Sequence, residues 1–212
     1  MPKVTILDYG IGNILSVNRA FEYCGAEVIL TDRPEEVIKA DMLVLPGVGA
    51  FGDGMKGLAS RNLIDPIREY AKTNRPFLGI CLGMQMMLDE SEEFGIHEGL
   101  GLIHGRVVKI DDTAVDGYMH KIPHIGWNGL VAPSCAKWDN TILAGIPADS
   151  TVYFVHSFTA VPDNDENRLA DAYYGGRLIS AVIRQGNIYG CQFHPEKSGK
   201  TGLKIIENFL RL

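Results

Sequence analysis

Apolar residues recur with two different spacings along the first 90 residues. Short apolar runs, as in β-strands, alternate with longer stretches in which apolar side chains stand three or four positions apart, as on one face of a helix. Strands are predicted at 4–7, 28–30, 42–45 and 77–80, and helices at 14–24, from residue 34 and at 63–71. Strands that alternate with helices pair in parallel through right-handed crossovers. This half of the chain therefore predicts an α/β fold.

The pattern changes after residue 100, where short β-like runs are separated by Gly, Pro, Asn and Asp. These runs are 105–110, 151–158, 168–174, 179–184 and 188–191, and a helical pattern returns at 202–212. No linker-like segment or internal repeat divides the chain. We therefore expect one α/β domain over residues 1–212, with a mixed, mostly parallel central sheet flanked by helices.

The composition is that of an ordinary globular protein. The chain has 212 residues, 46% of them hydrophobic, and a formal net charge of −6 from 20 basic and 26 acidic side chains. This hydrophobic fraction excludes a disordered or collagen-like chain, and the modest acidic balance argues against nucleic acid as the main partner. No run approaches 18 apolar residues, and the first residues lack a signal-peptide pattern. We expect no membrane partner and a cytoplasmic location.

The cysteines and histidines do not form a metal-binding pattern. The four cysteines include no C-x-x-C pair, and they are too few for a disulfide scaffold. His120 and His124 are four residues apart, but the proline between them excludes the helix that would bring them together. Gly10 and Gly12 resemble part of a dinucleotide-binding fingerprint, but Leu15 replaces its third glycine. We expect neither a metal nor a cofactor.

Cys81 stands between two glycines where a predicted strand meets a helix-forming segment. The sequence is Gly79-Ile80-Cys81-Leu82-Gly83, followed by the helix formers of 84–88. This arrangement is typical of a nucleophile elbow, whose strained turn admits only small residues beside the nucleophile. The amino end of a helix would also favour the thiolate form of the sulfur. The alternative interpretation is a buried cysteine in an ordinary strand–helix turn.

A second motif, Phe193-His194-Pro195-Glu196, stands near the end of the sequence. The residue before a proline favours extended backbone, in which residues 194 and 196 project to the same side. A carboxylate beside an imidazole fixes its tautomer and stabilises its protonated form. Alone, the motif is more typical of a surface turn. Together with the cysteine elbow it supplies a nucleophile, a base and an orienting acid, so we predict a Cys81–His194–Glu196 triad.

A glycine-rich segment, 46–52, follows the third predicted strand. Elbow enzymes stabilise the oxyanion with the N–H of the residue after the nucleophile, here Leu82, and with an N–H from a neighbouring strand–helix loop. A glycine-rich loop can present its N–H groups in this way. The alternative interpretation is a flexible turn.

Taken together, these motifs resemble the class I, or triad, glutamine amidotransferases. Within that family they are most similar to the glutaminase subunits of imidazole glycerol phosphate synthase, over residues 4 to about 210. The similar segments are Asp8-Tyr9-Gly10-Ile11-Gly12-Asn13, Pro46-Gly47-Val48-Gly49-Ala50-Phe51, Cys81-Leu82-Gly83-Met84-Gln85, His120 to Asn128, and Phe193-His194-Pro195-Glu196-Lys197-Ser198. The Gly-Val-Gly loop and the lysine after the glutamate point to the subunit.

The resemblance implies that residues 1–212 form a glutamine amidotransferase domain that hydrolyses L-glutamine to glutamate and ammonia. Cys81 would attack the carboxamide, His194 would transfer the proton to ammonia, and Glu196 would orient His194. The Val48 N–H, presented after a peptide flip, would join that of Leu82 in the oxyanion hole. The implied substrate-holding residues are Gly49, Gln85, Glu93, Ser157 and Phe158.

The resemblance also implies a heterodimer with a cyclase subunit, a (βα)₈ barrel. Ammonia would pass into the barrel and react with a phosphoribulosyl-formimino aminoimidazole carboxamide ribotide. The products would be imidazole glycerol phosphate and AICAR, in L-histidine biosynthesis. Asn13, Tyr153 and Lys197 would lie towards the partner, and the glutaminase would be nearly idle without it.

Three alternative functions differ from this one in the reaction catalysed or in the use of the ammonia. A paralogous amidotransferase subunit would supply ammonia to a surface-sugar or other biosynthetic synthase. A catalytically inactive module would only regulate its partner, although an intact Cys81, His194 and Glu196 argues against this. A cysteine hydrolase of peptide or ester bonds would share the elbow without transferring ammonia.

Overall fold

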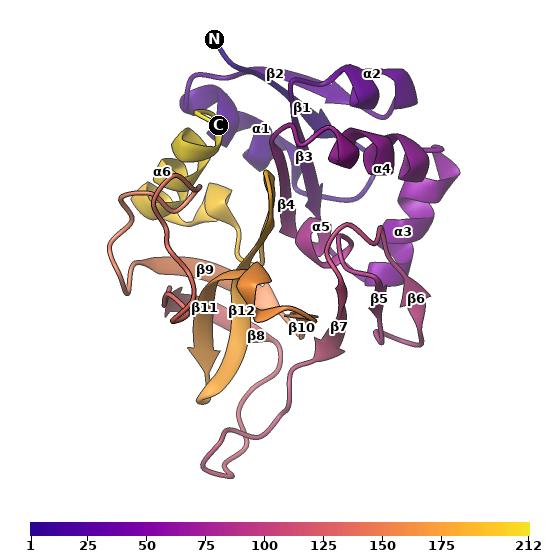
Figure 1. Cartoon of the computed structure of the whole chain (residues 1–212). Coiled ribbons are helices and arrows are strands. Elements are labelled where there is room, and N and C mark those ends of the chain that lie inside the picture. Colours follow the sequence, from indigo (N-terminus) through magenta and orange to yellow (C-terminus); the bar gives the residue numbers. More distant parts are fainter.

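A seven-stranded sheet forms the centre of the protein in a computed structural model that describes all residues from 1 to 212 (Figure 1). Its strand order is β11-β12-β13-β4-β3-β1-β2. The strands are β1 (Lys3–Leu7), β2 (Glu27–Thr31), β3 (Met42–Gly47), β4 (Phe77–Cys81), β11 (Arg168–Tyr174), β12 (Arg177–Gln185) and β13 (Ile188–Cys191). The five strands from β13 to β2 pair in parallel, and β12 and β11 add to the edge in antiparallel fashion. The predicted mixed, mostly parallel α/β sheet is confirmed.

Helices cover both faces of this sheet (Figure 1). One face carries α1 (Ile14–Tyr23) and α6 (Gly199–Phe209), and the other carries α2 (Pro34–Lys39), α3 (Phe51–Ser60) and α4 (Ile64–Lys72). Phe21 of α1 and Phe209 of α6 meet edge to face, with ring centroids 6.1 Å apart. Successive residues of β3 supply opposite cores, because Val44 packs under α1 and α6 while Leu43 and Leu45 pack against the other helices.

Two small sheets extend from the carboxyl side of the central sheet. The first, in the order β10-β7-β5-β6, contains β5 (Glu90–Ser91), β6 (His97–Glu98), β7 (Gly105–Lys109) and β10 (Phe158–Pro162), and the second pairs β8 (His124–Gly129) with β9 (Thr151–His156). The prediction of one strand over 151–158 is therefore wrong at Ser157. There the chain leaves one sheet and enters another, so Ser157 lies at a break between strands rather than within one.

Helix α3 is not predicted by the hydrophobic pattern, because its sequence contains glycines at 52, 54 and 57 and glycine costs about 1 kcal/mol in a helix interior. Each glycine permits a close contact. A methyl group on Gly52 would lie 2.9 Å from the His97 ring, one on Gly54 2.7 Å from the sulfur of Met86, and one on Gly57 3.0 Å from the Tyr9 ring. Tertiary packing thus offsets the poor helix propensity, and the predicted glycine-rich loop ends earlier than expected.

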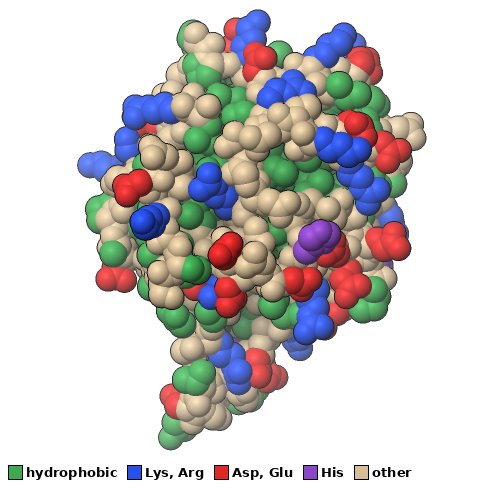
Figure 2. Space-filling model, in the orientation of Figure 1, with side chains coloured by type: hydrophobic (Ala, Val, Ile, Leu, Met, Phe, Trp, Pro, Cys, Tyr) green, Lys and Arg blue, Asp and Glu red, His purple; other side chains and the backbone are tan.

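Charged side chains of both signs are interspersed over the visible surface, without a continuous basic patch (Figure 2). None of the helices combines the length and hydrophobicity required to cross a lipid bilayer.

Candidate active site

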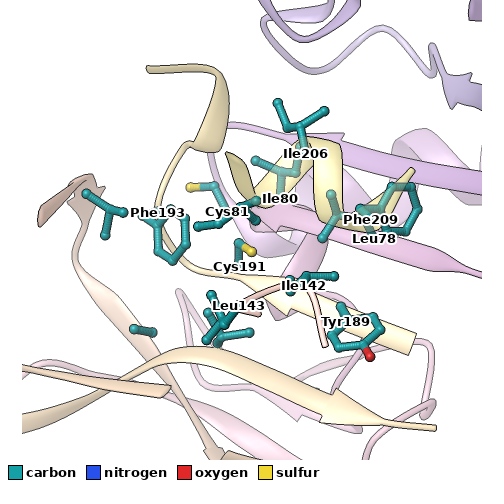
Figure 3. Close-up of a cluster of buried hydrophobic side chains, with 14 of the residues drawn as sticks. Leu78, Ile80, Cys81, Ile142, Leu143, Tyr189, Cys191, Phe193, Ile206 and Phe209 are labelled. Atoms are coloured by element: carbon teal, nitrogen blue, oxygen red, sulfur yellow. The ribbon is translucent and has the colours of Figure 1, made fainter. Parts of the chain in front are cut away.

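Cys81 occupies a sharp turn between β4 and the single-turn helix α5 (Leu82–Gln85). Its backbone has φ = 55° and ψ = −110°, a conformation that costs a non-glycine residue free energy. The residue packs in the same buried cluster as Ile80, Cys191 and Phe193 (Figure 3). The strained strand–turn–helix geometry is that of a nucleophile elbow.

The glycines around Cys81 are required by close backbone packing. A Cβ on Gly83 would overlap the carbonyl oxygen of Leu45 in β3, and one on Gly79 would lie 2.8 Å from the Gly83 backbone. The helix after the elbow is shorter than the predicted 84–88 segment. It ends at Gln85 because the carbonyl groups of residues 86–88 accept hydrogen bonds from the backbone of residues 100–103 instead.

His194 and Glu196 lie beside each other, with both side chains almost completely buried. His194 Nδ1 donates to Glu196 Oε1 across 2.8 Å. The expected extended segment is present only at His194, because Pro195–Lys197 forms a 3₁₀ turn, η2. The turn nevertheless brings the carboxylate to the imidazole. Ser198 Oγ donates to the His194 carbonyl across 2.7 Å and holds the turn in place.

The surroundings of His194 favour its protonated form. Burial alone would lower the imidazole pKa, but the hydrogen bonds and charges of Cys81 and Glu196 outweigh it and raise the pKa to about 9. No protein atom forms a regular hydrogen bond with His194 Nε2. The Cys81 thiol lies beside this imidazole. The imidazole can therefore exchange a proton with the thiol or with a molecule bound next to it.

A cavity of about 410 Å³ opens in front of the elbow. Its walls include ten of the predicted site residues, namely Val48, Gly49, Cys81, Leu82, Gln85, Glu93, Ser157, Phe158, His194 and Lys197. Glu196 lies behind His194, away from the cavity wall. A larger cavity of about 790 Å³ lies between α4, residues 100–102 and the turn from β12 to β13, but it contains no cysteine or histidine. The chemistry-bearing side chains converge on the smaller cavity.

Four predicted residues have surroundings that the sequence did not indicate. One oxygen of Glu93 accepts a 2.6 Å hydrogen bond from the Phe51 N–H and so caps α3. Lys197, predicted to face the partner, is exposed and also reaches the cavity wall. Asn13 and Tyr153 lie outside the cavity; Asn13 is exposed, and Tyr153 is half-buried in β9.

Tyr9 and Gln192 belong to the site although neither received a role from the sequence. The Tyr9 hydroxyl donates to the Pro46 carbonyl across 2.8 Å and holds the start of the glycine-rich loop. Burial and the nearby Cys81 raise the pKa of this phenol. Gln192 contacts Cys81 and Gln85. No local signal in the sequence identifies Gln192, because its contact with Cys81 depends on the pairing of β13 with β4.

His124 and His156 form a buried pair beside the cavity. His156 Nδ1 donates to the Phe158 carbonyl across 2.8 Å, and its Nε2 lies 3.0 Å from His124 Nδ1, so His124 is the donor in the second bond. Burial is the main cause that lowers the pKa of His156 to about 3 and that of His124 to about 4. Both imidazoles are therefore neutral near pH 7, and His156 also lines the cavity.

Acid is expected to destabilise the protein through this pair. Below pH 6.5 both histidines gain protons in the unfolded chain but not in the folded one, so stability falls until pH reaches the folded pKa values of about 4 and 3. Between pH 7 and pH 5 the loss is about 2 kcal/mol for each imidazole. Urea unfolding at both pH values should show a smaller loss for His156→Gln than for the wild type. The exposed control His104→Gln should match the wild type, and equal losses in all three proteins would contradict the prediction.

Comparisons with known proteins agree with this geometry. The family model "Glutamine amidotransferase class-I" matches residues 5–212. Imidazole glycerol phosphate synthase subunit HisH 1 of Legionella pneumophila (strain Lens) is 62% identical over 213 residues, with all of both chains covered. Subunit HisH of Sulfurimonas denitrificans is 43% identical over 208 residues, which cover 98% of this chain and 97% of that protein.

Solved structures show the same fold. A crystal structure of a glutamine amidotransferase aligns with a TM-score of 0.72 at 16% identity and covers 99% of each chain. PurLQS from Thermotoga maritima aligns with a TM-score of 0.72 at 19% identity, covering 99% of this chain and 98% of that one. With a family match over nearly its whole length and relatives at 62% and 43% identity, the chain belongs to the class I glutamine amidotransferases and, within them, to the HisH family.

Proposed function

We propose that this protein is the glutaminase subunit of imidazole glycerol phosphate synthase and acts in a cytoplasmic heterodimer. It hydrolyses L-glutamine and delivers ammonia to a cyclase subunit. The observation that carries the proposal is the buried Cys81–His194–Glu196 constellation at the wall of a cavity, in a chain 62% identical to a HisH subunit.

In the first half of the reaction, the Cys81 sulfur attacks the side-chain carbonyl carbon of glutamine. His194 takes the thiol proton and passes it to the amide nitrogen as the carbon–nitrogen bond breaks, so that ammonia leaves. Water then attacks the γ-glutamyl thioester, His194 takes a proton from it, and the sulfur recovers that proton as glutamate is released. Glu196 holds His194 in the tautomer with Nδ1 protonated and offsets its positive charge.

Two backbone N–H groups would hold the oxyanion that forms on the carbonyl oxygen. The Leu82 N–H follows the nucleophile directly, and the Val48 N–H belongs to the loop after β3, whose Gly47 pairs in register with Cys81. The Val48 N–H belongs to the Gly47–Val48 peptide, so a turn of that peptide would present it. Gly49, next along the chain, has φ = 93° and no atom within 4 Å of the position that a Cβ would occupy, so the backbone after Val48 has room to adjust. Loss of one such donor typically costs about 10²–10³ in kcat.

The remaining cavity residues would hold the substrate. Gln85 uses its amide N–H groups within the protein and leaves its Oε1 for a substrate donor. Glu93 supplies a carboxylate on the wall, with Gly49, Ser157 and Phe158 completing the substrate site.

The partner surface would lie beside this cavity and include Asn13, Tyr153 and Lys197. The ring of Tyr153 meets that of Trp127 at a centroid distance of 6.0 Å, and Trp127 is 56% exposed. An aromatic pair with one ring exposed suits a protein interface. The partner would be a (βα)₈ cyclase that consumes the ammonia and forms imidazole glycerol phosphate.

The function can be tested by measuring glutamine hydrolysis with and without the cyclase. We expect a low rate for the isolated chain and a rise of about 100-fold when the cyclase and its nucleotide ligand are added, because the oxyanion hole is then completed. The cyclase without its ligand is the control. Full activity of the isolated chain would contradict the idea that the loop after β3 completes the oxyanion hole only in the complex. If the chain hydrolyses glutamine but no cyclase activates it, an amidotransferase with another ammonia acceptor is favoured.

A further inference from the structure

Gln192 is a completely buried polar residue that the reaction described above does not use. It directly follows β13, whose last residue, Cys191, pairs with Ile80 of the parallel strand β4. The next residues along the two strands are Gln192 and Cys81. The strand register therefore sets the side chain of Gln192 beside the nucleophile.

The carboxamide of Gln192 connects two parts of the site. Its Nε2 donates a long hydrogen bond of 3.9 Å to Cys81 Sγ, and its Oε1 accepts a 3.0 Å hydrogen bond from Gln85 Nε2. The Gln192 backbone is itself held, because its N–H donates to the Ala181 carbonyl across 2.9 Å. One amide thus contacts both the nucleophile and a residue of the substrate cavity.

The hydrogen-bond network determines which way both amides point. Gln85 Nε2 also donates to the Phe158 carbonyl across 3.0 Å, and that carbonyl accepts from His156 Nδ1 as well. A carbonyl oxygen cannot donate, so Gln85 must direct its NH₂ group towards Phe158 and Gln192. Gln192 must then direct its oxygen to Gln85 and its NH₂ group to the sulfur.

We propose that Gln192 is a positioning residue that orients the Cys81 sulfur through its NH₂ group and the Gln85 carboxamide through its oxygen. This inference rests on the proposed glutaminase function. The NH₂ group stabilises the thiolate by donating to it, and the oxygen keeps Gln85 Oε1 available to glutamine. The two roles use different atoms, so they can be separated.

Two substitutions separate the two roles of Gln192. Gln192→Met keeps a similar volume but removes both contacts, and we expect kcat to fall about tenfold and KM for glutamine to rise several-fold. Gln192→Glu keeps an oxygen for Gln85 but replaces the donor to the sulfur with an acceptor. We expect its KM to stay within about twofold of the wild type while kcat falls about tenfold or more.

A second readout does not involve glutamine. The rate of Cys81 alkylation by iodoacetamide should fall about tenfold in Gln192→Glu near neutral pH and shift towards higher pH, because a carboxylate beside the sulfur disfavours the thiolate. Gln192→Met removes the donor without adding a charge, so its alkylation rate should fall by a smaller factor in the same direction, whereas a purely structural role would leave the rate and pH profile of this variant unchanged. Mass spectrometry of the alkylated peptide would verify that Cys81 is the residue measured.

The control is a buried amide outside the site. Asn208 of α6 donates to the carbonyl groups of Ile142 and Ala144 at 3.0 and 2.8 Å, and Asn208→Leu should lower the melting temperature without changing kcat, KM or alkylation. If both Gln192 variants behave like Asn208→Leu, the positioning role is wrong. If Gln192→Met does not fold, the nearly isosteric Gln192→Glu decides alone.

All glutaminase assays use the complex with the cyclase. A wild-type complex that does not hydrolyse glutamine would refute the proposed function rather than this inference.

Discussion

Replacing Cys81 by alanine is expected to abolish glutamine-dependent synthesis while ammonium-dependent synthesis by the complex continues. The nucleophile forms the covalent intermediate, and its loss typically lowers kcat by about 10⁴–10⁶-fold. Added ammonium salts bypass this chain, because the acceptor would be bound by the cyclase. The measurement is the rate of product formation by the reconstituted heterodimer with L-glutamine and, separately, with ammonium chloride.

Cys24→Ala is the matched control for this experiment. Cys24 lies at the carboxyl end of α1, where its sulfur contacts the Leu203 carbonyl, and it does not line the cavity. Both activities should survive in that variant. If Cys81→Ala retains glutamine-dependent synthesis, the assignment of the nucleophile is wrong; if it loses both activities, the damage extends beyond the glutaminase step.

Gly83→Ala is expected to have the largest effect of any single added methyl group. The new Cβ would overlap the Leu45 carbonyl oxygen, and this oxygen belongs to the backbone of a central strand that cannot rotate away. Overpacking typically costs about 1–3 kcal/mol and more where backbone must move. Because β3 and the elbow would have to separate, we expect at least about 3 kcal/mol of destabilisation and at least about 100-fold lower glutaminase activity.

Gly95→Ala distinguishes steric overlap from the general cost of replacing a glycine. Gly95 has φ = 119°, but no atom lies within 4 Å of the position that the new methyl group would occupy, so the substitution introduces backbone strain without a clash. We expect a cost of about 1–2 kcal/mol and nearly unchanged activity of the complex. Urea unfolding and glutamine hydrolysis would be measured on both variants. Equal effects of the two substitutions would show that packing of the elbow against β3 is not the reason for glycine at position 83.

The strands and helices of the first 90 residues were largely predictable because their signals are local. Pro34 and the two acidic residues after it begin α2 as expected, and Gly25, with φ = 89°, follows the end of α1. The exception, α3, shows where local reasoning fails. Its glycines reduce helix propensity, and their benefit comes from contacts with residues up to 48 positions away.

The residues of the candidate site also fall into those that the sequence predicts and those that it does not. Cys81 with its flanking glycines, and His194 with Glu196, are recognisable because each group is short and depends on backbone geometry over a few residues. Gln192 and the capping role of Glu93 were not predicted, because their partners are 111 and 42 residues away in sequence. Such contacts depend on which strands pair and in which register, and no local pattern contains that information.

By itself, then, the sequence determined the α/β class, the position of the elbow and the types of residue available for the chemistry. These follow from hydrophobic periodicity and from the backbone conformations that glycine and proline permit. Tertiary structure alone decided that β4 and β13 run side by side, that Ser157 separates two sheets, and that the resulting cavity lies in front of Cys81. The physical reason is that a cavity is formed by side chains from several elements, whose relative positions depend on the packing of the whole core.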